Sequence, residues 1–148
     1  MSERKRSDSP REAGDQFGRL IAELWHGQFG GRQHGFWPPV DSYSTEDPPQ
    51  LVVVVELPGI DPEQVQIVLH DRALIIAGER PRPTKCNRHY HQMEVDYGPF
   101  QRRIQIHEQV DAEAASATYE RGLLQIVLPI AKRPTGAVRV PIELRSKP

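Results

Sequence analysis

The sequence has few of the features that mark secreted, redox-active or membrane-spanning proteins. Cys86 is the single cysteine, so neither an intrachain disulfide nor a CxxC redox pair can form, and a reducing compartment is the simpler expectation. Residues 51–60, LVVVVELPGI, form the longest apolar run and are too few to cross a bilayer. Residues 1–15 carry charge without the apolar centre of a signal peptide. We therefore expect a soluble, cytoplasmic protein with no stable membrane insertion.

The chain also lacks an excess of charge of one sign and a recognisable phosphate-binding loop. Its 19 Lys and Arg side chains nearly balance its 20 Asp and Glu side chains, which leaves no broad basic face for nucleic acid. No GxxxxGK[ST] motif occurs, so a nucleotide should be unnecessary and no cofactor is expected.

Metal-ligating residue types are sparse, with one cluster of C-x2-H-x-H spacing at Cys86, His89 and His91. His70 or His107 could complete it as a zinc site, but the spacing matches no strong zinc pattern. Exposed loop residues are the favoured interpretation, and no metal is expected. Cys86 as a nucleophile with His89 as its base is less favoured still, because no orienting residue or oxyanion signature accompanies them.

Proline, by contrast, is abundant. Fourteen prolines among 148 residues exceed the usual share of about 5% and favour extended segments over long helices. The length suits one ordinary core, and the 37% hydrophobic content is low enough that part of the chain should stay outside that core. We expect one domain with arms.

The N-terminal part predicts a disordered start followed by a short amphipathic helix at about residues 15–26. Its apolar positions recur at helical spacing and are Phe17, Leu20, Ile21, Leu24 and Trp25. About three turns are marginally stable alone, so the stripe needs a surface to pack on. Packing inside an oligomer or contact with other proteins is favoured over membrane binding, because the neighbouring charges are mixed. A glycine-rich stretch with Phe29, Phe36 and Trp37 follows.

Short β-strand signals fill the middle of the chain. The predicted strands are LVVVVEL (51–57), VQIVLH (65–70), ALIIAGE (73–79), RRIQIH (102–107), SATYE (116–120) and LLQIVLP (123–129). The dipeptides DR and RG join two pairs of them as hairpins. Close spacing without helical patterns favours an antiparallel β-sandwich. HYHQMEV (89–95) and VRVPIEL (138–144) are further strand candidates without an obvious partner in their own domain.

Several stretches resemble the α-crystallin (Hsp20) family of small heat shock proteins, in the order found there. They are PPVDSYSTED, VVVELPGI, EQVQIVL, LIIAGER, YGPFQRR and, after Ala117, RGLLQIVLP. The last is the most specific, since Gly122 can take the positive φ of a tight hairpin while Leu124 points into a sandwich. Arg121 departs from the Asn or Asp often found before this glycine, and IQIHEQV lacks the Leu-Pro of many bacterial relatives.

The resemblance implies an all-β, immunoglobulin-like antiparallel sandwich with two appendages. The expected parts are an N-terminal arm (1–36), an α-crystallin domain (37–131) and a C-terminal tail (132–148). In the family the tail docks in a groove of another subunit, and here Val140 and Ile142 fit that motif, with Val138 one step upstream. Candidates for the groove are Val65, Ile67, Val68, Leu69, Ala117 and Tyr119.

The resemblance further implies a dimer in which the strand 89–95 is exchanged between subunits. Its expected contacts are Tyr90, Met93 and Val95 on one subunit and Val40 and Tyr43 on the other. Arg102 matches a family arginine at the dimer contact, where its guanidinium could bridge to a carboxylate, and Arg103 is the alternative.

The implied function is that of an ATP-independent holdase chaperone, which binds partly unfolded client proteins and forms larger homo-oligomers. The N-terminal stripe, with Phe29, is the expected client-binding surface. The first alternative is a non-chaperone interaction module on the same sandwich, as in p23-like co-chaperones, since a fold alone does not fix activity. The second is an enzyme using Cys86 and His89; we expect no enzymatic activity.

Overall fold

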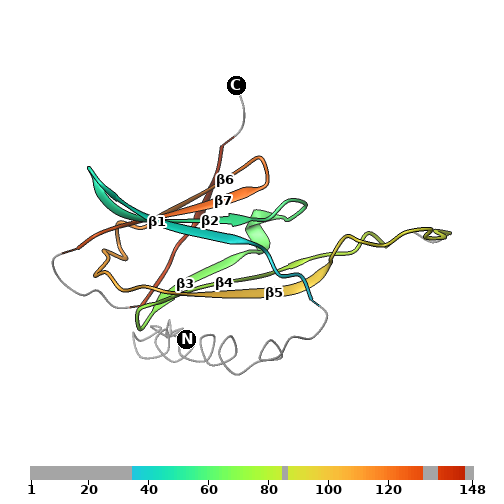
Figure 1. The fold of residues 1–148 in the computed structure, drawn as a ribbon, viewed down its shortest axis with the longest axis horizontal. Helices are drawn as coiled ribbons and strands as arrows, with labels where there is room; N and C mark the ends of the chain where they lie inside the picture. The colour runs from blue at the N-terminus through green and yellow to red at the C-terminus, as the bar shows by residue number, and fades with distance from the viewer. Residues whose placement is uncertain (1–34, 85–86, 132–136, 146–148) are drawn as a thin grey trace, which may run out of the picture. The chain divides into compact units, whose positions relative to one another are not determined.

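Two β-sheets pack face to face in the computed structural model, which describes residues 35–84, 87–131 and 137–145 (Figure 1). The five-stranded sheet runs in the order β1 (Val40–Glu46), β2 (Pro49–Glu56), β7 (Leu123–Pro129), β6 (Ser116–Glu120) and β9 (Ile142–Leu144). The four-stranded sheet runs in the order β5 (Gly98–Gln105), β4 (Ala73–Arg80), β3 (Gln66–His70) and β8 (Val138–Arg139). A short 3-10 helix, η1 (Pro62–Gln64), precedes β3. The predicted all-β sandwich is confirmed.

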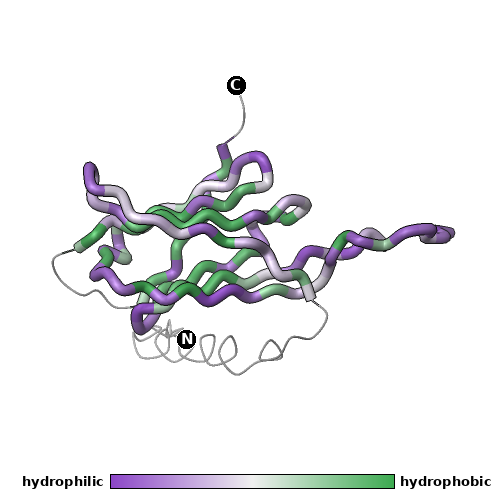
Figure 2. Tube along the Cα trace, in the orientation of Figure 1, coloured by the Kyte–Doolittle hydropathy of each residue, from purple (hydrophilic) through white to green (hydrophobic). Residues whose placement is uncertain are grey.

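The core lies between the sheets because alternate side chains of each strand point inward. Figure 2 shows hydrophobic segments along the facing strands of both sheets. Fully buried members include Val53 and Val55 of β2, Leu74 and Ile76 of β4, and Leu124, Ile126 and Leu128 of β7. Burying each such side chain contributes about 1.5–3 kcal/mol, which makes this layer the main source of stability.

Two tight hairpins fix the registers that position the later site. Asp71 (φ 46°) and Arg72 (φ 59°) join β3 to β4, and Arg121 (φ 52°) and Gly122 (φ 79°) join β6 to β7. Two successive left-handed residues match the twist of the flanking strands. At Gly122 a Cβ would lie 3.2 Å from the Cα of Pro58, so close packing also favours glycine. The predicted DR and RG hairpins are confirmed.

The structure differs from the sequence prediction at the strand before residue 106. The prediction placed it at 102–107, whereas β5 spans Gly98–Gln105 and pairs with β4 along its whole length. Ile106 has left the strand, yet its amide donates to the Arg72 carbonyl at 2.8 Å and its side chain is buried. The proline at position 99 concealed the strand's start, because proline is tolerated at a strand end or edge but not in a strand centre.

Phe36 belongs to the core, although the sequence placed it in the glycine-rich stretch ahead of the domain. Its ring is 8% exposed and packs edge-on against Phe100, with centroids 5.7 Å apart. The chain entering β1 is therefore fixed to the sandwich at this point.

Between β4 and β5 the chain leaves the sandwich as a long loop, residues 81–97, called here the β4–β5 loop (Figure 1, right). In its described residues no strand forms, so HYHQMEV is not a strand within this chain. Nearly all of these residues are exposed.

Candidate functional site

The C-terminal segment 137–145, called here the tail, joins the edges of both sheets. Val138 and Arg139 pair antiparallel with Leu69 and Val68 of β3. Three residues on, β9 pairs in parallel with β6, with Ile142 opposite Ala117. The chain crosses from one sheet to the other at Pro141, whose ring nitrogen has no hydrogen to donate to either ladder. The strand predicted at 138–144 therefore has two partners.

Three side chains of the tail share one inward face. Val140 is 3% exposed and belongs to the core, while Val138 and Ile142 are half-buried and pack against it. The Val140 amide also donates to the Ile67 carbonyl at 3.2 Å. Alternation along an extended chain explains why positions 138, 140 and 142 point the same way. Val140 is thus the deepest contact.

The groove under the tail is formed by β3 and β6, with η1 at one end. Ile67 and Leu69 of β3 and Ala117 of β6 are buried in the core, and Val65 and Tyr119 pack at its margin. An open pocket of about 420 Å³ remains beside the tail, lined among others by Pro62, Glu63, Val65 and Ile142. Pro62 and Glu63 were not predicted, and their only signal is the DPE turn before β3.

Val68 was a candidate for the groove, and its position corrects that choice. Its side chain is fully buried, but it alternates with Ile67 and Leu69 and lies outside the core cluster. It therefore occupies the opposite face of β3.

Tyr119 fixes the β6 side of the groove. Its hydroxyl donates to the Leu57 carbonyl at 2.6 Å, across 62 residues of sequence. Burial raises the pKa of the Tyr119 phenol above its usual value of 10.0. This bond holds β6 to the segment that follows β2, so the wall of the groove does not depend on the tail for its position.

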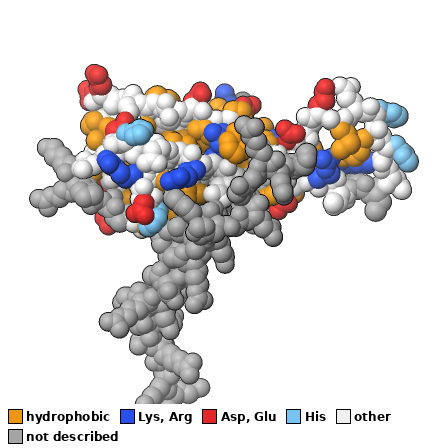
Figure 3. Space-filling model, turned by 60° about the horizontal axis from the view of Figure 1, so that its bottom comes forward, with side chains coloured by type: hydrophobic (Ala, Val, Ile, Leu, Met, Phe, Trp, Pro, Cys, Tyr) orange, Lys and Arg blue, Asp and Glu red, His pale blue; other side chains and the backbone are white. Residues whose placement is uncertain are grey.

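The candidate dimer residues lie apart from the groove. Tyr90, Met93 and Val95 are 50%, 59% and 58% exposed on the β4–β5 loop. In Figure 3 apolar side chains lie beside basic ones on this loop. Tyr43 is exposed on β1, whose residue Val40 packs against the core.

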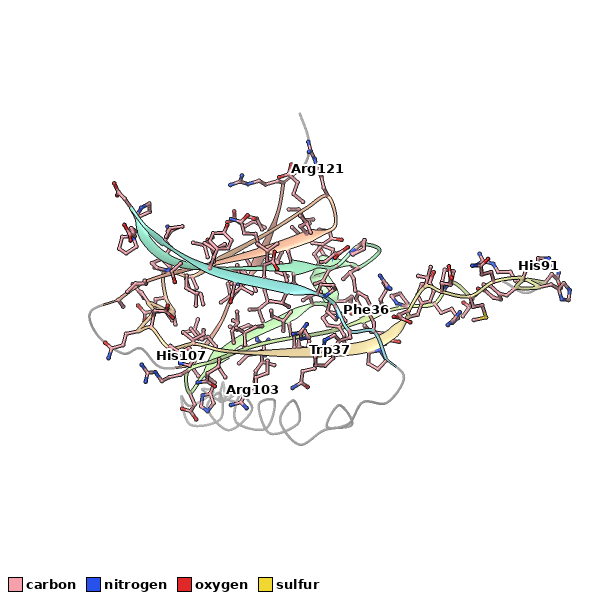
Figure 4. All side chains as sticks on the ribbon, in the orientation of Figure 1. Phe36, Trp37, His91, Arg103, His107 and Arg121 are labelled. Carbon is pink, nitrogen blue, oxygen red and sulfur yellow. The ribbon has the colours of Figure 1, made fainter. Side chains whose placement is uncertain are left out.

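Arg102 makes contacts within its own chain. One guanidinium nitrogen donates to the Pro38 carbonyl at 2.5 Å, and the guanidinium carbon lies 4.3 Å from the Trp37 ring centroid. Burial lowers the pKa of Arg102. Arg103 points to the other face of β5 and is exposed (Figure 4). Within the single chain Arg102 contacts a carbonyl and an indole face, and its bridge to a carboxylate at the dimer contact stays a prediction.

The candidate metal-binding residues and the candidate client-binding residues lie away from the groove or outside the described residues. His89 and His91 are exposed, with His91 near the far end of the β4–β5 loop (Figure 4). Cys86 and the client-binding candidates lie outside the described residues; the latter are Phe17, Leu20, Ile21, Leu24, Trp25 and Phe29. Within the described part of the chain no three His, Cys, Asp or Glu side chains could hold a metal ion together. No helix in that part could span a membrane.

Comparison with known proteins decides the family. Residues 43–143, well over half of the chain, match the Hsp20/alpha crystallin family. The chain belongs to this family. Its members are non-enzymatic chaperones, generally independent of ATP, typically oligomeric and able to bind client proteins.

Individual members of the family are similar in sequence to this chain over somewhat more than half of its length. The chain is 35% identical over 86 residues to small heat shock protein C2 of Rickettsia felis, covering 57% of this chain and 54% of that protein. It is 34% identical over 89 residues to the 16.9 kDa class I heat shock protein 1 of Triticum aestivum, covering 59% of each. The match thus spans a little over half the length of these relatives.

Solved structures are similar too. Heat shock protein 16.0 from Schizosaccharomyces pombe has a TM-score of 0.61 at 29% identity, covering 68% of this chain and 92% of that one. A small heat-shock protein from Xylella fastidiosa has a TM-score of 0.59 at 32% identity, covering 68% and 91%. These similarities agree with the two-sheet sandwich described above.

Proposed function

We propose that this protein is an ATP-independent holdase that binds partly unfolded proteins and prevents their aggregation, and that it works in the cytoplasm. The observation that carries the proposal is the burial of Val140 in a groove between β3 and β6, where no covalent bond holds it. We infer that this contact opens. When the tail leaves, an apolar strip with Ile67 and Ala117 and two sheet edges become accessible. Extended apolar segments of a client suit such a surface.

Magnitudes favour a reversible contact. Full burial of one valine or isoleucine side chain contributes roughly 1.5–3 kcal/mol. Val140 is buried, whereas Val138 and Ile142 are half-buried and contribute less. Ordering nine residues of tail offsets much of this gain. A single tail therefore binds weakly, whereas several tails in one assembly hold it together while each opens often.

Assembly follows from making the same contact between chains. A groove that accepts its own tail accepts the identical tail of a neighbour, as in domain swapping, and exchange of tails builds an oligomer without new interfaces. We further propose that the basic unit is a dimer in which the β4–β5 loop of one subunit pairs with β1 of the other. In its favour, β1 is an edge strand with its outer side unpaired in the described chain, and Met93 and Val95 are exposed.

The test is a heat-aggregation assay with a thermolabile reporter enzyme and no nucleotide, read by light scattering. We expect suppression at near-equimolar subunit ratios and a particle mass well above that of a dimer. A small particle without suppression would instead favour a p23-like interaction module. Absence of suppression by large oligomers would refute the holdase function directly.

The N-terminal stripe is proposed to contribute client contacts. Deleting residues 1–34 removes it and retains Phe36, so the sandwich should keep its far-UV circular dichroism spectrum. We expect weaker protection of the reporter enzyme. Undiminished protection would show that the stripe is dispensable.

A further inference from the structure

The base of the β4–β5 loop carries a column in which arginines and aromatic rings alternate. The Arg80 guanidinium carbon lies 3.6 Å from the ring centroid of Phe36 and 5.4 Å from that of Tyr97. The Arg82 guanidinium carbon lies 4.9 Å from Tyr97 and 6.0 Å from Tyr90. The order is Phe36, Arg80, Tyr97, Arg82, Tyr90, called here the Arg–aromatic column. All four distances are within reach of cation–π attraction.

The sequence Arg80-Pro81-Arg82-Pro83 explains why two arginines face the same way. Each proline fixes its own φ and restricts the residue before it to extended conformations. In an extended chain residues i and i+2 lie on the same side. Arg80 and Arg82 therefore both face the returning limb of the loop, which supplies the tyrosines.

The lower end of the column is anchored to the sandwich. Arg80 donates from Nε to the Asp96 carbonyl at 2.7 Å and from Nη1 to the Pro58 carbonyl at 3.4 Å. Beneath it Phe36 packs in the core, near the base of the loop in Figure 4. At the upper end, hydrogen bonds from Arg88 and then Arg82 lower the pKa of the Tyr90 phenol. The column thus links the core to the exposed part of the loop.

We propose that the Arg–aromatic column holds the β4–β5 loop in an extended form before the partner subunit binds, so that Arg80, Arg82 and Tyr97 are positioning residues for the homodimer. The inference rests on the strand exchange proposed above. Without the column, an exposed limb that carries Met93 and Val95 would have to be ordered at the moment of association. A preformed limb avoids that cost and binds more tightly with no new contact across the interface.

The test compares Tyr97→Leu, which removes the ring, with Tyr97→Phe, which keeps it. The dimer dissociation constant is obtained for the full-length protein by native mass spectrometry over a dilution series. The ratio of squared monomer to dimer concentration gives this constant whatever larger assemblies are present. We expect Tyr97→Leu to weaken the dimer about tenfold and Tyr97→Phe to stay within about twofold of the wild type.

A second pair of variants guards against misfolding at Tyr97. Arg82→Gln should weaken the dimer several-fold with an unchanged thermal midpoint, because Arg82 is exposed. Arg121→Gln, at the exposed β6–β7 turn, loses the same charge outside the column and should change nothing. If Tyr97→Leu and Arg82→Gln bind as the wild type does, the column has no positioning role. If the wild-type protein never forms a dimer, the strand exchange itself is wrong.

Discussion

The tail and the β4–β5 loop look alike in sequence but differ in the structure. The tail alternates apolar and polar residues over 138–144 and the loop does so over 93–97, yet Val140 of the tail is 3% exposed and Met93 of the loop is 59% exposed. The tail follows β7 through a short connection and reaches the free edges of β3 and β6. The loop leaves β4 and returns to its neighbour β5, so it meets no free edge of the other sheet. Alternation buries a strand only where an unpaired edge is within reach.

The difference also separates two kinds of association. The tail can dock in the groove of its own chain. It can therefore exchange between that groove and the identical groove of a neighbouring chain at little net cost in free energy. The described part of the chain leaves the apolar side chains of the loop exposed, so in the proposed dimer the second molecule would bury them and favour a persistent association. Under the proposed function, weak tails and a firm dimer together would give an assembly that dissociates into dimers.

Disabling the tail should have the largest effect. Val140→Gly combined with Ile142→Gly removes apolar contacts that contribute roughly 3–6 kcal/mol at most. We expect the oligomer to dissociate to dimers, measured by multi-angle light scattering, while the far-UV circular dichroism spectrum keeps its β-sheet form.

The matched control for the tail variant is Arg139→Gly combined with Glu143→Gly. Both residues lie in the tail and are exposed, so these two changes add the same backbone freedom without removing a buried side chain. The mass distribution of the control should equal that of the wild type. An unchanged distribution in the variant of Val140 and Ile142 as well would contradict tail exchange.

Placing charge on the β4–β5 loop should disrupt the dimer itself, not only the larger oligomer. Met93→Asp with Val95→Asp puts two carboxylates where the partner strand would bury apolar groups, so the dimer dissociation constant should rise more than about a hundredfold. The thermal midpoint of the monomer should hardly move, because both residues are exposed in the single chain. Analytical ultracentrifugation measures the first quantity and calorimetry the second.

The control for the loop variant adds equal charge elsewhere on the loop. Thr84→Asp with Gln92→Asp changes two exposed residues that are not in the apolar set. A dimer that survives the control and is lost in the test variant identifies the apolar face as the contact. Dimers that survive both would refute the exchange.

The sequence predicted the fold where local signals agree. In the hairpin of β6 and β7 the alternation, the RG turn and both strand bounds matched the structure. The sequence-based prediction was wrong where contacts between distant residues determine whether a side chain is buried. Phe36 is buried because the ring of Phe100 lies beside it, 64 residues away in sequence, and no periodicity near Phe36 indicates this contact.

The candidate site was predictable as a set of residues but not as a geometry. Alternation shows that Ile67 and Leu69 share a face and Val68 has the other, but not which face meets the groove. The Arg–aromatic column was missed, although RPRP before tyrosines is a readable signal: prolines that keep two arginines on one side.

The smallest effect is expected for Tyr119→Phe. This variant distinguishes the stability of the groove wall from the docking of the tail. Tyr119→Phe removes the hydroxyl that donates to the Leu57 carbonyl, which should lower the free energy of unfolding by about 1 kcal/mol. The mass of the oligomer should stay the same, because the ring still packs at the margin of the core. Thermal unfolding and light scattering check the two expectations.

The pH dependence of Tyr119→Phe gives a further check on the same bond. Burial raises the folded-state pKa of Tyr119 above 10.0, so unfolded chains lose this proton first as the pH rises. The stabilisation from Tyr119 is complete below pH 10 and is lost as the pH climbs through the folded-state pKa. Stability should therefore fall less steeply above pH 10 in Tyr119→Phe than in the wild type. Parallel curves would mean that the hydroxyl is as well solvated in the folded groove as in the unfolded chain.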